Sequence, residues 1–373
     1  MGARASIQPE IHDQGLFLRP WRAADAEAVH LACQDPAIQR WTQAPSPYLP
    51  EHARYFVTEH ATASWEKGTA AHFAVVDPDS GDLLASCGLV TIDRVLSSAE
   101  VGYWTAPWAR GRGVATRATR AVSRWAFESL AMRRVVWQAA VGNHASRLVA
   151  LRAGFRIEGY LRLAESGLDA WVGSLLPGTP MDPVLDERVV RRARLFDGEQ
   201  PVLTAKGGLR LRPPEPRDFD AMVEACRDPE SVRWTSVPDP YDRSHAEEFA
   251  TRITPTRWGR GDGVIYAIAD PDDAWAGAID LIISAHDPLV GEVGFLAAPR
   301  VRGRGYTTAA LSAICGWGFR SLGLARIVWR AHVGNVASRR VAEKAGFTIE
   351  GTQRAGLAHR GERKDAWVGG LVP

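Results

Sequence analysis

The chain has 373 residues, 46% of them hydrophobic and 24% charged, and a formal net charge of +2. This length predicts two domains, each large enough to bury a core of its own. The near-neutral charge excludes a protein that acts mainly through a basic nucleic-acid-binding face. No apolar run approaches the roughly 18 residues of a membrane span, and the N-terminus has no signal-peptide pattern. We therefore expect a cytoplasmic protein without a membrane partner.

The first half of the chain alternates between helix and strand patterns. After a loose lead-in over residues 1–14, apolar spacing, β-branched runs and Pro or Gly breaks define its elements. Asn143 suits the N-cap of a helix, and Gly154 suits the stop of the same helix. We expect strands at 16–20, 71–76, 83–91, 99–105, 134–140, 157–161 and 168–176, and helices at 25–33, 51–67, 116–130 and 143–152.

The second half repeats the first. Residues 130–159 and 322–351 align without gaps and are identical at 19 of 30 positions. Between the copies, the pattern changes to Pro, Gly and charged residues, which is typical of a linker. We therefore predict two domains of one fold, at 1–178 and 207–373, joined by a linker at 179–206.

The cysteines and histidines form no metal-binding pattern. The ten histidines show neither an H-x-x-x-H nor an H-x-x-E-H pair. The four cysteines have no metal-site spacing, and we expect them to be reduced core residues. The sequence therefore predicts no metal cofactor. The cysteines are Cys33, Cys87, Cys226 and Cys315.

Each copy carries Arg-Gly-x-Gly directly before a predicted helix. Such a loop presents backbone N–H groups beside the positive end of a helix dipole, and its arginines add charge-assisted hydrogen bonds. It suits a phosphate or pyrophosphate, although a plain turn into a helix is the alternative. The candidate binding residues are Arg110, Gly111, Arg112, Gly113, Val114 and Ala115 in the first copy and Arg302, Gly303, Arg304, Gly305, Tyr306 and Thr307 in the second.

The motifs together resemble one family. A strand with Glu-Val-Gly, then R-x-x-G-x-A before a helix, Asn-x-x-Ser on a later helix and Ala-Gly-Phe-x-x-Glu-Gly are similar to the GCN5-related N-acetyltransferases (GNAT). The likeness is greatest to the RimJ/RimL-type branch, which acetylates ribosomal-protein N-termini and other small amines. It extends over residues 16–176 and 209–372.

The resemblance implies a fold and a donor. The fold is α/β with a mixed sheet: each domain has a twisted, mostly antiparallel sheet of six or seven strands, flanked by about four helices. One parallel pair splays apart, and the pantetheine arm of acetyl-CoA lies in the opening like an added strand. These strands are 100–105 with 135–141 in the first copy and 292–297 with 327–333 in the second.

The resemblance also implies catalytic roles. Asn143 and Asn335 are candidates to hold the pantetheine amide, and both also suit helix N-caps. Ser146 and Ser338 are candidates to protonate the departing thiolate, because Ala150 and Ala342 stand where many relatives carry a tyrosine. The candidate bases are Glu100 and Glu292, acting through water, and Glu165, which Leu357 replaces in the second copy.

A loop with aromatic residues precedes the second helix of each copy and resembles the acceptor-side loop of the family. It suggests substrate binding, although a hydrophobic plug under a helix pair is equally consistent with the pattern. The candidate substrate-binding residues are Trp41, Tyr48, Trp234 and Tyr241.

The sequence therefore predicts an acyltransferase that moves an acetyl group from acetyl-CoA to a primary amine. The acceptor is a small molecule, an antibiotic-like amine or a peptide N-terminus. One alternative is an aminoacyl-tRNA-dependent aminoacyl transferase of the same fold, and another is one catalytic half with a structural or ligand-sensing half. We expect a monomer with pseudo-dimeric halves or a homodimer, and copies that are not equivalent.

Overall fold

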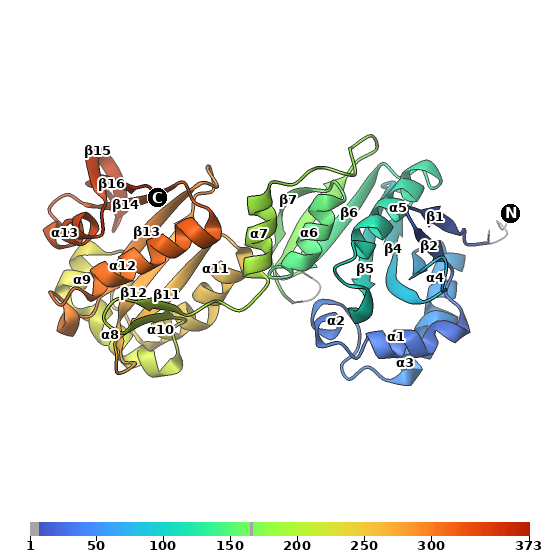
Figure 1. Cartoon of the computed structure of the whole chain (residues 1–373), viewed down its shortest axis with the longest axis horizontal. Helices are drawn as coiled ribbons and strands as arrows, with labels where there is room; N and C mark the ends of the chain where they lie inside the picture. The colour runs from blue at the N-terminus through green and yellow to red at the C-terminus, as the bar shows by residue number, and fades with distance from the viewer. Residues whose placement is uncertain (1–6, 165–166) are drawn as a thin grey trace. The chain divides into compact units, whose positions relative to one another are not determined.

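The computed structural model of the chain describes residues 7–164 and 167–373. The chain divides into two compact units, Met1–Asp186 and Glu187–Pro373, which are called the first and second units below (Figure 1). Both contain a mixed sheet with helices on its faces, as expected for this fold class. The predicted domain and linker bounds stay predictions.

The first unit has an eight-stranded sheet in the order β1-β2-β3-β4-β5-β6-β8-β7. Neighbouring strands are antiparallel except β5 and β6, which are parallel. The strands are β1 (Ile11–Asp13), β2 (Leu16–Arg19), β3 (Ala71–Val76), β4 (Leu83–Asp93), β5 (Ser98–Thr105), β6 (Arg134–Ala140), β7 (Arg156–Leu161) and β8 (Ala170–Leu175).

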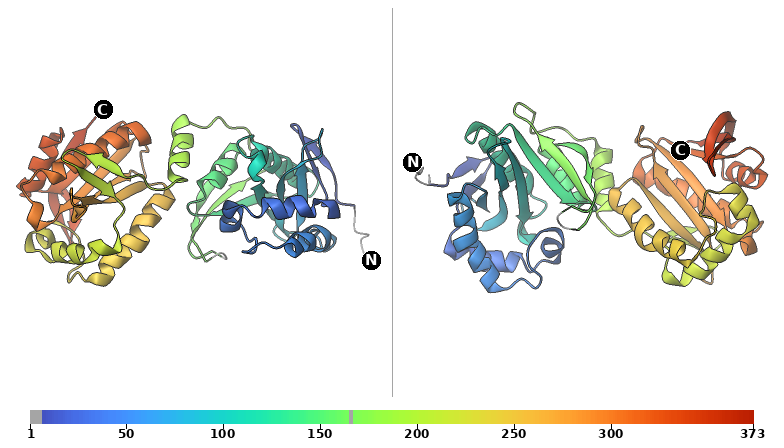
Figure 2. Two further views of the ribbon diagram at one scale, coloured as in Figure 1. Left: turned by 60° about the horizontal axis from the view of Figure 1, so that its bottom comes forward. Right: turned by 180° about the vertical axis from the view of Figure 1, so that it is seen from behind.

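Helices cover both faces of this sheet. The long helix α5 packs on one face, where its apolar residues join those of β3 to β6 in a core. The helices between β2 and β3 form a second core on the other face (Figure 2). The helical segments are η1 (Ala23–Asp25), α1 (Ala26–Ala32), α2 (Pro36–Trp41), α3 (Pro50–Tyr55), η2 (Phe56–His60), α4 (Ala61–Glu66), η3 (Pro107–Ala109), α5 (Val114–Glu128) and α6 (His144–Arg152).

The second unit repeats this topology in the order β15-β16-β14-β13-β12-β11-β10-β9, with β13 and β14 as its parallel pair. Its last two strands form a longer hairpin than β7 and β8, because extra residues continue the pairing as far as His359 and Glu362. The strands are β9 (Leu203–Ala205), β10 (Leu209–Arg212), β11 (Gly263–Ala269), β12 (Trp275–Ile283), β13 (Val290–Ala297), β14 (Arg326–His332), β15 (Thr348–His359) and β16 (Glu362–Leu371).

One continuous apolar core fills the second unit and reaches both faces of its sheet. Helix α12 crosses one face (Figure 1). The helical segments are α7 (Glu187–Phe196), η4 (Pro216–Asp218), α8 (Phe219–Arg227), α9 (Pro229–Trp234), α10 (Arg243–Glu248), η5 (Phe249–Ile253), α11 (Thr254–Arg260), η6 (Pro299–Val301), α12 (Tyr306–Trp317), η7 (Gly318–Leu322) and α13 (Val336–Lys344).

The predicted number of six or seven strands was wrong by at least one strand in each unit. Strands β1 and β9 have three residues each, which is too short for an alternating pattern to be visible in the sequence. Part of the segment 179–206 belongs to the second unit. Helix α7 contacts it through Arg192, whose Nε donates to the Leu322 carbonyl at 2.7 Å.

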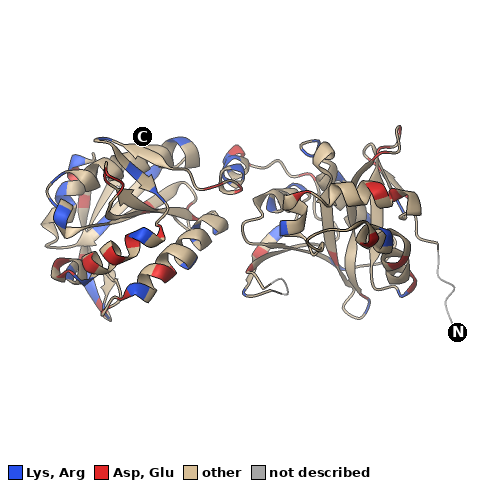
Figure 3. Ribbon diagram, turned by 90° about the horizontal axis from the view of Figure 1, so that it is seen from below, with Lys and Arg blue, Asp and Glu red and all other residues tan. Residues whose placement is uncertain are grey.

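All four cysteines are buried and free, as expected. No helix in the described part of the chain is long and apolar enough to cross a bilayer. Basic and acidic residues both occur along the helices of each unit (Figure 3).

A buried ion pair occurs at the same place in both units. The Arg19 guanidinium donates to both Asp25 oxygens at 2.8 Å, and Arg212 makes the same two bonds to Asp218 at 2.8 and 2.9 Å. Each pair joins the end of the second strand to the helical turn that follows it. The pairing raises the pKa of both guanidinium groups above their usual value, so both stay charged.

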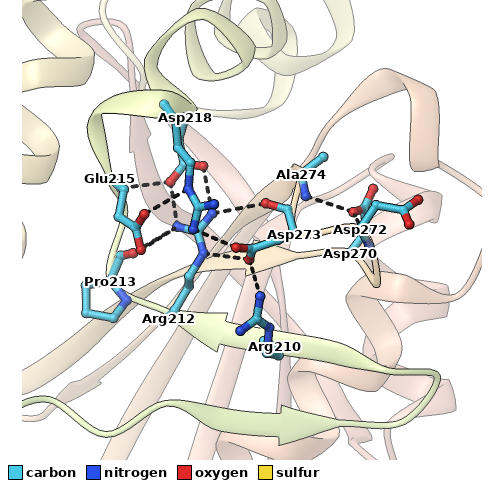
Figure 4. Close-up of polar contacts among 10 residues, drawn as sticks. Arg210, Arg212, Pro213, Glu215, Asp218, Asp270, Asp272, Asp273 and Ala274 are labelled. Carbon is cyan, nitrogen blue, oxygen red and sulfur yellow. Dashed lines mark hydrogen bonds and ion pairs between the residues drawn. The ribbon is translucent and has the colours of Figure 1, made fainter.

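In the second unit, further charged residues join this ion pair. Asp273 also accepts a bond from Arg212 Nε at 3.1 Å and forms an ion pair with Arg210 at 2.6 Å (Figure 4). The Arg212 guanidinium therefore has three carboxylate partners, Asp218, Asp273 and, at 3.7 Å, Glu215. The Arg19 guanidinium has Asp25 as its buried partner.

This difference predicts unequal sensitivity to substitution. Asp25→Ala should lower the free energy of unfolding of the first unit by about 3–5 kcal/mol, because it leaves a buried charge without its partner. Asp218→Ala should cost the second unit less, since Asp273 remains. Urea unfolding followed by tryptophan fluorescence measures both. As a control, Glu10→Ala breaks an exposed ion pair with Arg22 and should cost at most about 1 kcal/mol. Equal losses for Asp25→Ala and Asp218→Ala would contradict the compensation by Asp273.

Candidate active site

The parallel strands of each unit separate halfway along their length. In the first unit, β5 pairs with β6 from Ser98 to Val101, and the pairing stops although β5 continues to Thr105. In the second unit, β13 pairs with β14 from Val290 to Val293, and β13 continues to Ala297. The predicted splay is therefore present in both units.

Beyond the last parallel pair, the residues of β5 and β13 no longer alternate between buried and half-buried positions. Along the paired half of β5 and β13, buried and half-buried residues alternate, and the four residues that follow are all half-buried. On one side these residues pair with β4 or β12. The opposite edge faces the opening, so its backbone groups are available to an extended ligand.

The glycine-rich loops end beside these openings. Gly113 and Gly305 are the N-caps of α5 and α12, with φ of 71° and 80°. This left-handed conformation favours glycine. No atom lies within 4 Å of the position that a Cβ would take at either residue, so both loops are open to a ligand. The first amides of each helix have no partner within the helix, and together these features fit a pyrophosphate.

The first arginine of each loop forms an ion pair with an aspartate at a helix N-terminus. Arg110 donates to both oxygens of Asp35, at 2.7 and 3.1 Å, and Arg302 donates to Asp228 at 2.5 Å. Hydrogen bonding to these arginines holds the pKa of both carboxyl groups below its usual value. These arginine side chains therefore fix the loop to the N-terminus of α2 or α9.

The other loop residues differ in how they are held. Arg112 lies 3.8 Å from Asp77, and the Arg304 guanidinium lies over the Tyr306 ring, 5.0 Å from its centre. Val114 is buried in the core, so its backbone is the part of it that can bind a ligand. Four further predicted residues lie on the surface of the loops or at the start of the helices: Gly111, Gly303, Ala115 and Thr307.

Asn143 and Asn335 both serve as helix N-caps. The Oδ1 atom of Asn143 accepts from the Ser146 amide at 3.0 Å, and that of Asn335 accepts from the Ser338 amide at 3.1 Å. The N-cap role predicted from the sequence is therefore present in both units. It uses the side-chain oxygen, so the NH₂ group of each asparagine can still bind a ligand.

The Ser146 hydroxyl belongs to a three-member network. It lies 3.0 Å from the Tyr103 hydroxyl and accepts from Trp137 Nε1 at 3.1 Å, and the same Nε1 lies 3.0 Å from the Tyr103 oxygen. Burial raises the pKa of Tyr103 above its usual value, so its hydroxyl keeps its proton. Tyr103 is therefore a second hydroxyl beside the splay. The motif did not predict it, because the family's tyrosine lies on the helix, where this chain has Ala150, and Tyr103 lies on β5.

Ser338 has a simpler environment. Its hydroxyl accepts from Trp329 Nε1 at 3.1 Å, and Phe295 occupies the position that matches Tyr103. The two units thus share the Trp–Ser contact and differ in the second hydroxyl.

The three glutamates proposed as bases have different environments. Glu100 accepts a bond from Gln138 Nε2 at 3.2 Å. Glu292 is held by Arg330, which donates to its two oxygens at 3.0 and 2.5 Å, so the carboxylate is already engaged. Glu165 lies outside the described residues.

The second unit has a cleft of about 1770 Å³ at its splay. The walls come from β12 to β14, α9, α12, α13 and the end of β15. Residues along it include Leu296, Tyr306, His332, Ser338, Leu357 and Asp280.

Asp280 is a functional candidate that the sequence analysis missed. It lies on β12 in register with Gly294 of β13, whose amide donates to its Oδ1 at 3.2 Å. Burial raises the pKa of this carboxyl group to about 7. The signal in the sequence is a lone acidic residue within the apolar run of β12.

The predicted acceptor-loop aromatics divide into two groups. Trp41 and Trp234 have arginine neighbours stacked on them, Arg40 and Arg233, and their rings approach the loops before α6 and α13. The nearest ring atoms lie 3.4 and 3.6 Å from the Cβ positions of Gly142 and Gly334.

Tyr48 and Tyr241 lie inside the helix layers. They are 6% and 5% exposed and pack beside Cys33 and Cys226, with Tyr241 also on the wall of the cleft. Their packing matches the hydrophobic plug considered from the sequence. A role in substrate binding stays a prediction for all four aromatics. Among the described residues, no group of three or more His, Cys, Asp or Glu side chains could hold a metal ion.

Similarity to known proteins agrees with this geometry. The chain matches the acetyltransferase (GNAT) domain twice, over residues 15–156 and 208–348. The protein named "Putative ribosomal N-acetyltransferase YdaF" of Bacillus subtilis is 44% identical over 82 residues, 22% of this chain and 45% of that protein. The ribosomal-protein-serine acetyltransferase of Escherichia coli is 33% identical over 106 residues, 28% of this chain and 58% of that protein.

The chain thus spans about half the length of these two curated relatives. Among solved structures, RimJ of Mycobacterium smegmatis in complex with CoA-disulfide matches with 20% identity and a TM-score of 0.41, over 46% of this chain and 86% of that one. The two domain matches together cover more than half of the chain and include both splays and both glycine-rich loops. The resemblance seen in the motifs is confirmed: the chain belongs to the GNAT acetyltransferase family, with two copies of the domain in tandem.

Proposed function

We propose that this protein is an N-acetyltransferase that moves the acetyl group of acetyl-CoA to a primary amine. The observation that carries the proposal is the interrupted parallel pair in each unit, which ends beside a helix start with left-handed glycines. An extended thioester arm needs a strand edge to pair with, and its pyrophosphate needs unpaired amides. The splay and the loop supply these two features side by side.

Acetyl-CoA supplies the activated acyl group. Pairing of its pantetheine arm with the free edge of β5 or β13 would fix the thioester beside Gly102 or Gly294, where the strands part. Holding donor and acceptor in one place removes much of the entropic barrier to their reaction. The backbone of residues 110–115 and 302–307 is proposed to hold the pyrophosphate. The NH₂ groups of Asn143 and Asn335 are proposed to hold the pantetheine amide.

Hydroxyl groups next to the splay are proposed to return a proton to the departing thiolate. In the first unit these are Ser146 and Tyr103, which lie 3.0 Å apart. In the second unit Ser338 has this role without a neighbouring phenol, because Phe295 occupies the matching position.

The acceptor is proposed to be a small amine or a peptide N-terminus. The name of the Escherichia coli relative, a ribosomal-protein-serine acetyltransferase, supports testing peptides that begin with serine. Aminoacyl-tRNA as donor is not favoured, because binding a polyanion calls for an excess of basic residues and the chain has a formal net charge of only +2. A cytoplasmic location and the oligomeric state stay predictions.

Thiol release from acetyl-CoA tests the proposal. The full chain would be assayed with serine- and alanine-initiated hexapeptides, spermidine and an aminoglycoside, and product would be identified by mass spectrometry. An amine-dependent rate with an N-acetylated product is expected for at least one acceptor class. Absence of acetyl-CoA binding by calorimetry would overturn the proposal.

The glycine loop predicts the effect of a substitution on donor binding. Gly305→Val and Gly113→Val should each weaken acetyl-CoA binding at their own unit by at least about tenfold, because a branched side chain is strained at positive φ and covers the open loop. Isothermal titration calorimetry gives the affinity and the number of sites.

The matched control is Gly361→Val. Gly361 also has a positive φ, of 85°, and no atom lies near its Cβ position, but it lies in the turn between β15 and β16. It should suffer similar backbone strain and keep its affinity for acetyl-CoA. Loss of affinity in the control, or none in the loop variants, would reject the assignment of the loop.

The unequal hydroxyl groups predict unequal losses. Ser338→Ala should lower turnover by about tenfold or more, whereas Ser146→Ala should lower it less, because Tyr103 can still deliver a proton in the first unit. Adding Phe295→Tyr to Ser338→Ala should restore part of the rate, since a phenol would then stand beside Trp329. The decisive measurement is steady-state thiol release; equal losses in the two single variants, without rescue, would refute this role.

A further inference from the structure

We propose that Asp280 is the general base of the second unit, the group that accepts the proton of the incoming amine. This rests on the proposed acetyl-transfer function. Asp280 pairs in register with Gly294, which is the first residue of β13 beyond its last parallel pair, Val293 with Trp329. The carboxylate therefore lies at the point where the strands part, on the wall of the cleft.

A glycine on the neighbouring strand makes room for this carboxylate. A Cβ at Gly294 would lie 3.0 Å from Asp280 Oδ2 and 3.2 Å from its Oδ1. The Gly294 amide also donates to Oδ1 at 3.2 Å. One carboxylate oxygen is thus oriented by the Gly294 amide at the edge of the splay.

The apolar surroundings of Asp280 suit a base that works near neutral pH. Ile265 is its partner across β11, and Ile253 lines the same cleft. Burial raises the pKa of the carboxyl group to about 7, the Gly294 bond and Arg257 oppose the shift, and Glu292 adds to it. A base with a pKa close to the working pH is ionised often enough and still accepts protons well.

Other ionisable groups around the cleft are held in ion pairs or have a pKa shifted by burial. Arg257 is paired with Asp262 at 3.1 Å, and Glu292 is paired with Arg330. Burial lowers the pKa of His332, and His359 and Lys364 lower it further, so this imidazole is a weaker base than usual. From α8, burial raises the pKa of the Cys226 thiol to about 11 and keeps it neutral. His245, Glu248 and His359 also line the cleft.

The first unit has different chemistry at this place. Gly88 occupies the position of Asp280, because it pairs with Gly102 as Asp280 pairs with Gly294. Its partner across β3 is His72, whose ring centre lies 5.4 Å from that of His60. Burial lowers the pKa of His72 to about 4. This imidazole is neutral at pH 7 but a much weaker base than Asp280, so the second unit should carry most of the turnover.

The Asp280 carboxylate takes one proton from the bound ammonium group, and the free amine attacks the thioester carbonyl. A C–N bond forms and the C–S bond breaks. The amide nitrogen loses its second proton to water, and the leaving thiolate takes a proton from the Ser338 hydroxyl, which water restores. Asp280 then releases its proton to solvent, so one proton is produced overall.

Asp280→Asn tests the proposal in the full chain. The side chain keeps its shape and loses its basicity, so turnover with the best acceptor of the panel should fall about 100-fold or more. The acid limb of the pH profile of kcat/KM, expected near pH 7 in the wild type, should disappear. Affinity for acetyl-CoA should stay unchanged. Asp272→Asn, an exposed substitution in the turn before β12, should leave all three quantities unchanged.

Different results would overturn the role of Asp280 and the proposed acetyl transfer. A wild-type protein that acetylates no amine would overturn the proposed function and this role with it. An active wild type combined with an active Asp280→Asn variant that keeps its acid limb would overturn the role of Asp280 alone. Loss of acetyl-CoA affinity in the variant would point to a structural effect and would also reject the role.

Stability provides a second readout that needs no acceptor. A carboxyl group whose pKa is raised on folding stabilises the protein below its unfolded pKa, near 4, and loses this contribution as the pH rises through about 7. Asparagine cannot ionise. The melting temperature of Asp280→Asn should therefore rise relative to the wild type between about pH 4 and about pH 7. A difference that does not change with pH would contradict the buried titration.

Discussion

A backbone edge that stops pairing inside a sheet leaves N–H and C=O groups that need other partners, and a buried group without one costs about 1–3 kcal/mol. In both units such an edge is left where the parallel pairing ends. Trp137 and Trp329 stand at the last paired positions, are about 1% exposed and donate Nε1 to the serine on the next helix. Each indole therefore fixes the serine beside the place where the strands separate, and the rest of the site is arranged around that contact.

The sequence predicted most of the fold because its signals are local and occur twice. Alternation and β-branching predicted strands close to β3 and β6, and the N-cap role of Asn143 is confirmed. The short strands β1 and β9 escaped detection because three residues give no period. Residues 357–359 of the second copy continue the hairpin by pairing with β16.

The site was less predictable, because its chemistry depends on contacts across strands. Tyr103 and Ser146 are 43 residues apart and meet only because β5 and α6 converge. Asp280 lies at the splay because it pairs in register with Gly294, and burial raises the pKa of its carboxyl group. Repeated motifs predicted where a donor would bind and which serines lie beside the splay. Tyr103 and Asp280 were missed because they stand at positions where the two copies differ.

The exchange of glycine and aspartate between the units has a consequence for how the two copies can evolve. In the first unit, a Cβ at Gly88 would lie 2.2 Å from the carbonyl oxygen of Ala71. A carboxylate at that position would therefore require β3 and β4 to move apart. The spacing of these two strands, and not only the choice of one side chain, keeps this acidic residue to the second unit.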